Sequence, residues 1–351
     1  MSFFNEFELE RYSRQLPLIG KEGQKRLKSS CVLIAGIGGL GCWSALLLTE
    51  MGIGTLRLVD RDVVEISNLH RQPLYTENDL DYPKAEIAAN HLALRNSKVK
   101  FEPVATNIDE KSASRLLEGV DVLVDGLDSL KARSALNKAC IAKGVPYIFA
   151  GATARSSNIS TFLSDRESPC LSCLYEGVDE SMLPTCETVG IHPAILPIAA
   201  GIQISEVVRL LTHQKLRLVN KLLFINIESL SFDTITINRR PDCSVCSNIQ
   251  ASNEVIPPQT HITELCGKDA FMVRPKEPII IDLEASLRKI SSRFTIKTSS
   301  KLGITFEIKE GVIVSLMRGG NALIRGIKSK KESLDVYNES LELSTVEKLE
   351  D

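Results

Sequence analysis

The amino-acid sequence predicts an α/β protein with a doubly wound, mostly parallel sheet, antiparallel strands that close it, and a small α+β domain at the C-terminal end. Two observations support this prediction. Residues 31–60 follow a strand, glycine turn, helix, strand pattern, and the composition changes after residue 247 to short β-like runs. We therefore expect a large domain at 1–247, a polar, proline-ended linker at 248–258, and a small domain at 259–345.

The elements of the large domain follow from the hydrophobic pattern. Residues 5–15 predict a helix with Arg11 and Arg14 on one face, because residues three apart are neighbours on a helix surface. The short apolar run 31–35 is typical of a parallel strand that is covered on both faces. The later pattern predicts, in order, a helix at 40–51 ended by Gly52, a strand at 55–59, a helix at 83–95, strands at 99–105 and 120–125, a buried helix within 191–211 and paired strands within 225–239.

The small domain is expected to contain short strands around one helix, with a turn at Gly319 and Gly320. The acidic residues 340–351 are expected to be frayed. The formal net charge of −2, from 42 basic and 44 acidic residues, gives no overall field that would attract nucleic acid. The sequence has no signal-peptide pattern and no run of about 18 uncharged apolar residues, so we expect a cytoplasmic protein outside the membrane.

The segment 31–60 predicts a Rossmann-like nucleotide-binding unit. The unpaired N–H groups and the positive dipole end of the helix that begins near residue 40 favour a phosphate group. Asp60 follows the second strand, where such folds place the carboxylate that holds a ribose hydroxyl pair. The glycines that let a ligand approach the backbone of the turn are Gly36, Gly38 and Gly39.

The residues after Asp60 distinguish between possible ligands. A glycine turn of this kind is most often a dinucleotide site, so a nicotinamide-dependent oxidoreductase is one alternative. A non-catalytic scaffold that retains the fold is another. However, Asn68 and Arg71 can hydrogen-bond phosphate oxygens, and Lys84 adds a further positive charge, which suits a triphosphate better.

Four motifs resemble those of the MoeB/ThiF/HesA adenylyltransferases, which are kin of the ubiquitin-activating enzymes. They are GIGGLG at 36–41, DRDVVEISNLHRQ at 60–72, Lys84 in YPKAE and Asp128 in DGLDS, and the likeness extends from about Glu10 to Cys246. The resemblance implies ATP and Mg²⁺, and activation of the C-terminal carboxylate of a ubiquitin-fold modifier or sulfur-carrier protein that ends in Gly-Gly. The nucleotide-binding residues it implies are Gly36, Gly38, Gly39, Asp60, Asp62, Asn68, Arg71, Gln72, Lys84 and Asp128.

The resemblance also assigns catalytic and binding roles, and some of these residues have a plainer alternative. It implies that Arg14 in ERYSRQ reaches the triphosphate of a neighbouring subunit, and hence a homodimer; the alternative is a solvated arginine. Arg71 would act on the phosphates. Asp128 would contact Mg²⁺ and triphosphate, or it could cap the helix that follows. Lys84 could be an ordinary surface lysine.

The cysteines predict a zinc site and a candidate acyl acceptor. Nine cysteines include two CxxC pairs, which together can complete a closed shell of four thiolates around zinc: Cys170, Cys173, Cys243 and Cys246. Cys186, in a loop between the pairs, resembles the cysteine that forms a thioester or acyl persulfide in some relatives; the alternative is an incidental cysteine. Glu187 would raise the pKa of its thiol, and His192 is a candidate helper. If Cys186 is not the acyl acceptor, Cys42 and Cys140 are the next candidates for that role. No rhodanese active-site loop is evident, so any sulfur donor would be another protein. The resemblance implies that donor or a conjugating enzyme as a downstream partner.

Overall fold

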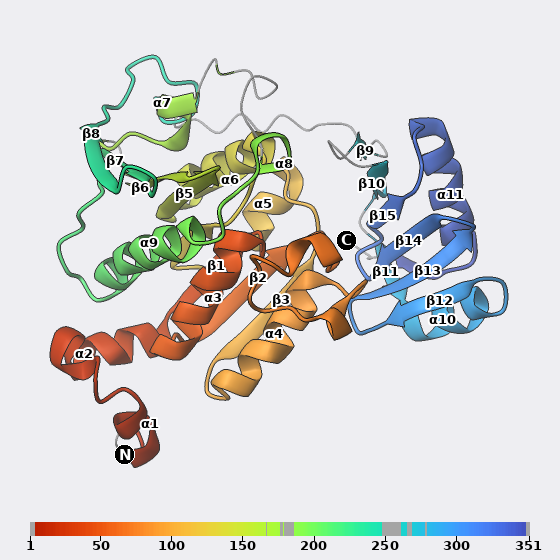
Figure 1. Cartoon of the computed structure of the whole chain (residues 1–351), viewed down its shortest axis with the longest axis horizontal. Coiled ribbons are helices and arrows are strands. Elements are labelled where there is room, and N and C mark those ends of the chain that lie inside the picture. The colour runs from red at the N-terminus through yellow and green to blue at the C-terminus, as the bar shows by residue number, and fades with distance from the viewer. Residues whose placement is uncertain are drawn as a thin grey trace.

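The structure, a computed structural model, describes residues 4–165, 167–175, 178, 186–247, 261–264, 269–277 and 279–348 of the 351-residue chain. It contains a large mixed sheet with helices on both faces and a separate antiparallel sheet that the C-terminal residues form beside it (Figure 1). The predicted fold class is therefore confirmed. The predicted linker 248–258 lies outside the described residues. Within the described residues, no helix combines the length and the apolar character needed to cross a membrane.

The large sheet has the strand order β3-β2-β1-β4-β5-β6-β7-β8. The neighbouring strands in the run β3-β2-β1-β4-β5 pair in parallel. Strands β6, β7 and β8 then add antiparallel pairs on the β5 side of the sheet. Its strands are β1 Cys31–Ala35, β2 Thr55–Asp60, β3 Lys100–Ala105, β4 Val122–Asp125, β5 Tyr147–Thr153, β6 Ser156–Phe162, β7 Lys221–Asn226 and β8 Ser231–Thr236.

Successive residues of β1 face opposite sides of the sheet, as the continuous apolar run requires. Val32 and Ile34 pack in the core under α3, α4 and α9, whereas Leu33 and Ala35 pack in the core under α5 and α6. The helices of this part are α1 Glu6–Arg11, α2 Leu16–Ser29, α3 Gly39–Met51, α4 Lys84–Arg95, α5 Glu110–Leu116, α6 Leu130–Lys143, α7 Leu171–Tyr175, α8 Cys186–Val189 and α9 Ile195–Leu211, with short 3₁₀ turns η1 Ile66–Asn68 and η2 Glu77–Asp79.

The glycine turn between β1 and α3 has the predicted form. Gly36 has a φ of 83°, which favours glycine, and a Cβ there would lie 2.7 Å from the carbonyl oxygen of Gly126. A Cβ at Gly41 would collide with the carbonyl oxygen of Gly36. The turn and the first turn of α3 can therefore pack this closely only with glycine at both positions.

The N-terminal residues do not form the single helix that the sequence predicted. Helix α1 ends at Arg11, and Tyr12 to Gln15 form a turn before α2 begins at Leu16. Arg11 donates to Glu50 at 3.0 Å and to the carbonyl oxygen of Arg95 at 2.7 Å, while Arg14 is exposed in the turn. The two arginines therefore do not share one helix face.

The C-terminal part builds a six-stranded sheet in the order β12-β13-β14-β15-β10-β9, with a separate pair of β11 and β16. Gly320, with a φ of 77°, makes the predicted turn before β15. The elements are β9 His261–Glu264, β10 Ala270–Arg274, β11 Ile279–Asp282, α10 Leu283–Ser291, β12 Thr295–Ser299, β13 Gly303–Lys309, β14 Val312–Met317, β15 Ala322–Arg325, α11 Lys330–Glu342 and β16 Thr345–Lys348.

Two predictions for this part were wrong. The sequence predicted one helix, but α11 is a second helix, capped by Ser329 and packed through Val336 and Tyr337. The end of the chain was expected to be frayed, but β16 pairs antiparallel with β11 from Thr345 to Lys348. The buried face of α11 includes serines, so the segment lacks the apolar periodicity on which the prediction relied.

Candidate functional site

The candidate site lies where the carboxyl ends of β1, β2 and β4 meet, the edge at which open α/β sheets bind ligands. Asp60, at the end of β2, is buried and accepts hydrogen bonds from the backbone N–H groups of Ile37 at 2.6 Å and Asp62 at 2.8 Å. This carboxylate therefore fixes the glycine turn against the next loop. Its contact with a ribose stays a prediction.

Lys84 is buried at the start of α4, so the alternative of an ordinary surface lysine is wrong. Its backbone N–H donates to the carbonyl oxygen of Asp62 at 2.9 Å, and its Nζ lies 3.6 Å from Oδ2 of the same residue. Burial acts to lower the pKa of Lys84, but the carboxylates of Asp62, Asp60 and Glu65 outweigh it and raise the pKa. Lys84 is therefore a cation at neutral pH beside the glycine turn.

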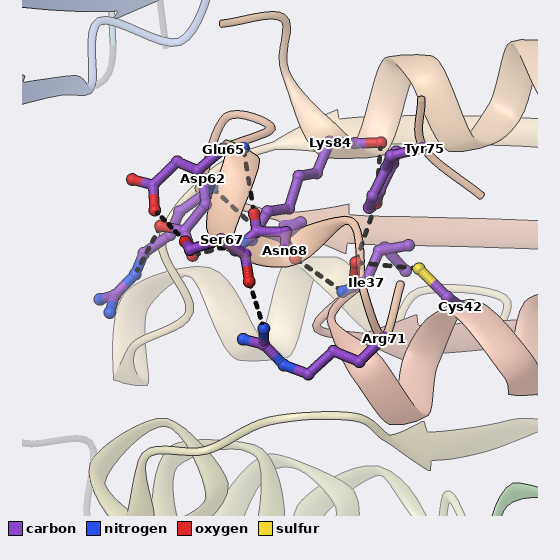
Figure 2. Close-up of polar contacts among 11 residues, drawn as sticks. Ile37, Cys42, Asp62, Glu65, Ser67, Asn68, Arg71, Tyr75 and Lys84 are labelled. Carbon is purple, nitrogen blue, oxygen red and sulfur yellow. Dashed lines mark hydrogen bonds and ion pairs between the residues drawn. The ribbon is translucent and has the colours of Figure 1, made fainter. Parts of the chain in front are cut away.

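The loop from β2 to α4 carries the polar side chains of the 60–72 motif (Figure 2). Asn68 is buried and accepts from the backbone N–H of Glu65 at 3.1 Å, so it holds the η1 turn together. Arg71 is less buried, and its guanidinium points back to donate to the carbonyl oxygen of Ser67 at 2.6 Å. The remaining guanidinium N–H groups of Arg71 can turn towards a phosphate.

Gln72 offers a polar group suited to a ligand. It is buried, and its Oε1 has no hydrogen-bond partner among the residues that the structure describes. Its Nε2 is the one described atom within 4 Å of a Cβ built on Gly38, at 3.9 Å. A buried orphan oxygen beside an open glycine backbone fits a ligand that donates a hydrogen bond, such as a ribose hydroxyl.

Tyr75 is a site residue that the sequence reasoning missed. It is buried, and its hydroxyl donates to the carbonyl oxygen of Ile37 at 2.8 Å and lies 3.4 Å from that of Lys84. It therefore links the glycine turn to the start of α4. No local pattern identifies it, because a tyrosine in a polar loop is usually exposed.

Asp128 follows β4 and is exposed. The N-cap of α6 is Ser129, whose Oγ accepts from the N–H of Ala132, so the capping role proposed as an alternative for Asp128 was wrong. The loop that carries Asp128 packs on the glycine turn through Gly126, next to Gly36. The carboxylate is thus free of a structural cap and lies in a loop that borders the turn.

A buried ion pair beneath that loop was also missed. Asp125 accepts from Nε of Arg133 and from the hydroxyl of Tyr147, both at 2.9 Å, and from the backbone N–H of Leu127 at 2.8 Å. Arg133 donates in turn to the carbonyl oxygen of Ala150 at 3.0 Å. Burial raises the pKa of Asp125 although Arg133 opposes the shift. These contacts hold the 126–129 loop from below.

The four predicted metal ligands come together. The sulfur atoms of Cys170, Cys173, Cys243 and Cys246 all lie within 4.8 Å of one another. Three of the six sulfur pairs are separated by 3.5 Å, 3.7 Å and 4.0 Å. Thiolates about 2.3 Å from a tetrahedral zinc would lie about 3.8 Å apart, so the cluster has the right size and donor set.

Neighbouring groups support this cluster from outside. Asn137 lies with its Nδ2 3.6 Å from the sulfur of Cys170 and accepts from the N–H of Leu171 at 3.1 Å. Arg239 donates to the carbonyl oxygen of Cys246 at 2.9 Å. These contacts orient the two turns that carry the cysteines, as outer contacts of metal sites do.

The candidate acyl acceptor is only partly described. Cys186 begins α8, but its side chain and that of Glu187 lie outside the described residues. His192 is exposed, and its Nδ1 accepts from the N–H of Ala194 at 3.2 Å, a local loop contact. Cys42 and Cys140 are buried, and burial raises the pKa of both thiols, that of Cys42 to about 12, so neither is a good nucleophile.

Arg14 lies far from the glycine turn of its own chain. The adjacent Gln15 donates to the carbonyl oxygen of Met51, at the C-terminal end of α3, whereas the glycine turn lies at the N-terminal end. The length of α3 separates them by about 18 Å, because a helix rises about 1.5 Å per residue. An arginine side chain cannot span that distance.

The fold and the candidate site define an α/β protein with a glycine turn, a buried lysine beside it and a four-cysteine cluster. The chain belongs to the ThiF family, whose model matches residues 12–245. It is 37% identical over 243 residues to the SAMP-activating enzyme E1 of Haloferax volcanii, covering 68% of this chain and 89% of that protein. It is 30% identical to the sulfur carrier protein ThiS adenylyltransferase of Bacillus subtilis, covering 93% and 98%.

A solved structure agrees with this assignment. The Escherichia coli MccB structure with ATP superposes with a TM-score of 0.60 at 27% identity, covering 69% of this chain and 75% of that one. Membership of the ThiF family confirms the resemblance that the sequence motifs indicated. It also argues against the nicotinamide-dependent oxidoreductase, because the curated relatives named above are an activating enzyme and an adenylyltransferase.

Proposed function

We propose that this protein uses ATP to adenylate the C-terminal carboxylate of a small ubiquitin-fold modifier or sulfur-carrier protein with a Gly-Gly end. The observation that supports this best is the buried cation of Lys84 at the start of α4, held beside the open glycine turn and the 60–72 motif. A site for a triphosphate needs this positive charge. The relatives, an activating enzyme and an adenylyltransferase, agree with this activity in kind.

The proposed chemistry is attack of the acceptor's carboxylate on the α-phosphorus of ATP, with pyrophosphate as the leaving group. The glycine turn and the N-terminus of α3 would bind the phosphates, and Asp60 or Gln72 the ribose. Lys84 and Arg71 would neutralise charge on the leaving pyrophosphate. Asn68 and Asp62 would position Lys84 and Arg71.

Mg²⁺ fits this site by its donor set. Asp128 is an exposed carboxylate without a capping role, and it borders the glycine turn, so it would hold the ion. A bound Mg²⁺ would supply positive charge to the triphosphate oxygens. The four cysteines would hold a structural zinc ion, which needs reduced thiols and so agrees with a cytoplasmic location.

The decisive test is ATP–pyrophosphate exchange with candidate ubiquitin-fold proteins from the same organism. Exchange that requires the carrier's intact C-terminus would support the proposal. A protein that binds ATP but gives no exchange with any of these carriers would instead behave as a non-catalytic scaffold.

We infer a homodimer in which Arg14 completes the partner's nucleotide site, because its own glycine turn is about 18 Å away along α3. We predict that mixing an Arg14→Ala subunit with an Arg71→Ala subunit, each inactive alone, restores exchange. A hybrid dimer with shared sites contains one site with both lesions and one with neither, so each hybrid should regain about half of the wild-type activity of a dimer. Failure to recover despite proven subunit exchange would contradict this role of Arg14.

We also propose that Cys186 accepts the acyl group after adenylation. We predict that Cys186→Ala keeps pyrophosphate exchange within about twofold of wild type, since adenylation precedes thiol attack, but loses any thiol-sensitive adduct with the carrier. Denaturing gels with and without a thiol reductant would measure the adduct. An adduct that persists in Cys186→Ala would reassign the thiol, while a wild-type protein that forms adenylate and no adduct would be a pure adenylyltransferase. Later sulfur transfer or conjugation would need another protein.

A further inference from the structure

The C-terminal sheet packs directly on the segment that carries Lys84. The carbonyl oxygen of Asp81 accepts from the hydroxyls of Thr298 at 3.0 Å and Thr305 at 2.8 Å, and its carboxylate lies 2.5 Å from Nη2 of Arg325. Asp81 has a φ of 67°, a left-handed conformation that is uncommon for a non-glycine residue and that surrounding contacts stabilise. The C-terminal domain supplies three of these surrounding contacts.

Two residues past Lys84, Glu86 makes a second anchor. Its carboxylate is buried and accepts from the backbone N–H groups of Lys301 at 3.0 Å and Leu302 at 2.9 Å, in the loop between β12 and β13. A carboxylate that accepts two backbone donors in a buried site is a strong, directional contact. Glu86 thus binds the first turn of α4 to the C-terminal domain.

Between these anchors, the backbone pairs with the strand-like segment that carries Asp62. Val63 and Pro83 form an antiparallel bridge, Val64 donates to Tyr82 at 2.9 Å, and Lys84 donates to Asp62 at 2.9 Å. The side chain of Val63 belongs to an apolar cluster that spans both parts of the chain. Its other members are Ala105, Ala270, Met272, Met317 and Leu323, with Leu302 packed against them.

Two further polar contacts extend this interface along β3 and α5. Asn321 donates to the hydroxyl of Thr106 at 3.2 Å, and Arg274 pairs with the carboxylate of Asp109, the N-cap of α5. The C-terminal domain therefore contacts the loops that follow both β2 and β3. A loosely tethered module would not contact so many adjacent loops at one edge of a sheet.

We propose that the C-terminal domain is a positioning element of the nucleotide site. By holding Asp81 and Glu86, it fixes the start of α4, and with it Lys84, at the distance from the glycine turn that phosphate binding requires. The positioning residues are Glu86 of α4 and Arg325 of the C-terminal domain, and both act through Lys84. This inference rests on the proposed function only in naming ATP as the ligand.

The test uses full-length protein and four changes: Glu86→Gln, Arg325→Ala, both together, and the conservative Arg325→Lys. The control is Lys309→Ala, which breaks an exposed ion pair with Glu332 elsewhere in the C-terminal domain. Binding of a fluorescent ATP analogue, KM for ATP and for the carrier in pyrophosphate exchange, and hydrogen exchange of peptides over residues 81–90 and 299–305 are measured. Thermal melting reports folding.

We expect the double variant to weaken binding of the ATP analogue and to raise KM for ATP at least fivefold, with KM for the carrier within twofold of wild type. Backbone N–H groups in 81–90 should exchange faster, Arg325→Lys should stay within twofold of wild type, and Lys309→Ala should change nothing.

If the double variant does not fold, the single Glu86→Gln variant gives the same comparison. The proposal is overturned if Lys301 and Leu302 lose protection while ATP affinity is unchanged, since the domain would then add stability alone. A wild type that binds ATP through these residues but gives no exchange would refute the proposed function and leave the positioning role intact.

Discussion

Replacing Arg71 by alanine is expected to reduce ATP–pyrophosphate exchange by at least about 100-fold at saturating ATP and Mg²⁺, and replacing Asp128 by alanine is expected to do the same. Removal of one preorganised group that stabilises charge in a transition state costs a factor of this order. Arg71 would act on the leaving pyrophosphate and Asp128 on the Mg²⁺ that accompanies it. The measurement is the exchange rate with a carrier that supports wild-type activity.

Neither change should unfold the protein. The observed contact of Arg71 is one exposed hydrogen bond to Ser67, which is worth on the order of 1 kcal/mol, and Asp128 does not cap α6. Circular dichroism and thermal melting check this. Arg95→Ala is a matched control, because Arg95 lies at the far end of α4, where it pairs with Glu50 at 3.5 Å.

A variant that kept near wild-type exchange would remove that residue from the proposed machinery. Loss of activity together with loss of the folded signal would show instead that the residue supports the fold. Arg71→Lys separates charge from geometry: a lysine retains the charge but not the fork of donors, so partial activity would indicate bidentate phosphate contact.

The parts of the site that the sequence predicted are local in the chain. The glycine turn from Gly36 to Gly41 forms between a buried strand and a helix, and backbone contacts within or next to the turn require glycine at Gly36 and Gly41. The cysteine pairs 170/173 and 243/246 also lie in two local turns. Only the contact between these two turns depends on the tertiary fold. Such local features can be recognised from short sequence motifs.

The parts that the sequence did not predict depend on contacts between distant residues. Tyr75 acts through a hydroxyl that reaches Ile37, and Arg133 is buried against Asp125 although arginine is rarely buried. Glu86 is an acidic residue in the first turn of a helix. The favourable interaction of such a residue with the helix dipole would alone explain its presence there. Its partners are more than 200 residues away, so no pattern in the sequence could reveal them.

Asp60 illustrates a residue for which fold and function overlap. The motif assigns it to a ribose, and the structure gives its carboxylate two backbone donors, from Ile37 and Asp62. Each carboxylate oxygen has a second lone pair, so the two roles are compatible. A substitution at Asp60 would therefore disturb the turn as well as the ligand, which makes Arg71 and Asp128 the cleaner tests of chemistry.

The largest expected effect on stability comes from the four-cysteine cluster. We predict about one zinc ion per chain, and loss of that ion together with more than about 4 kcal/mol of folding free energy in Cys243→Ser. Cys243 is fully buried, and its sulfur lies 3.7 Å from that of Cys170, so the metal would join the residues before α7 to the segment after β8. Elemental analysis and thermal melting measure the two quantities.

Cys31→Ser is the matched control, because Cys31 is a free, partly buried cysteine outside the cluster. It should retain zinc and melt within a few degrees of wild type. X-ray absorption on the wild type should give four sulfur ligands at about 2.3 Å. If wild-type protein purified without chelator contains no metal and melts at the same temperature after zinc is added, the cluster is four packed thiols and the zinc assignment is wrong. If instead zinc is present and Cys243→Ser lowers exchange only in proportion to the fraction that unfolds, the ion supports the fold and takes no part in adenylation.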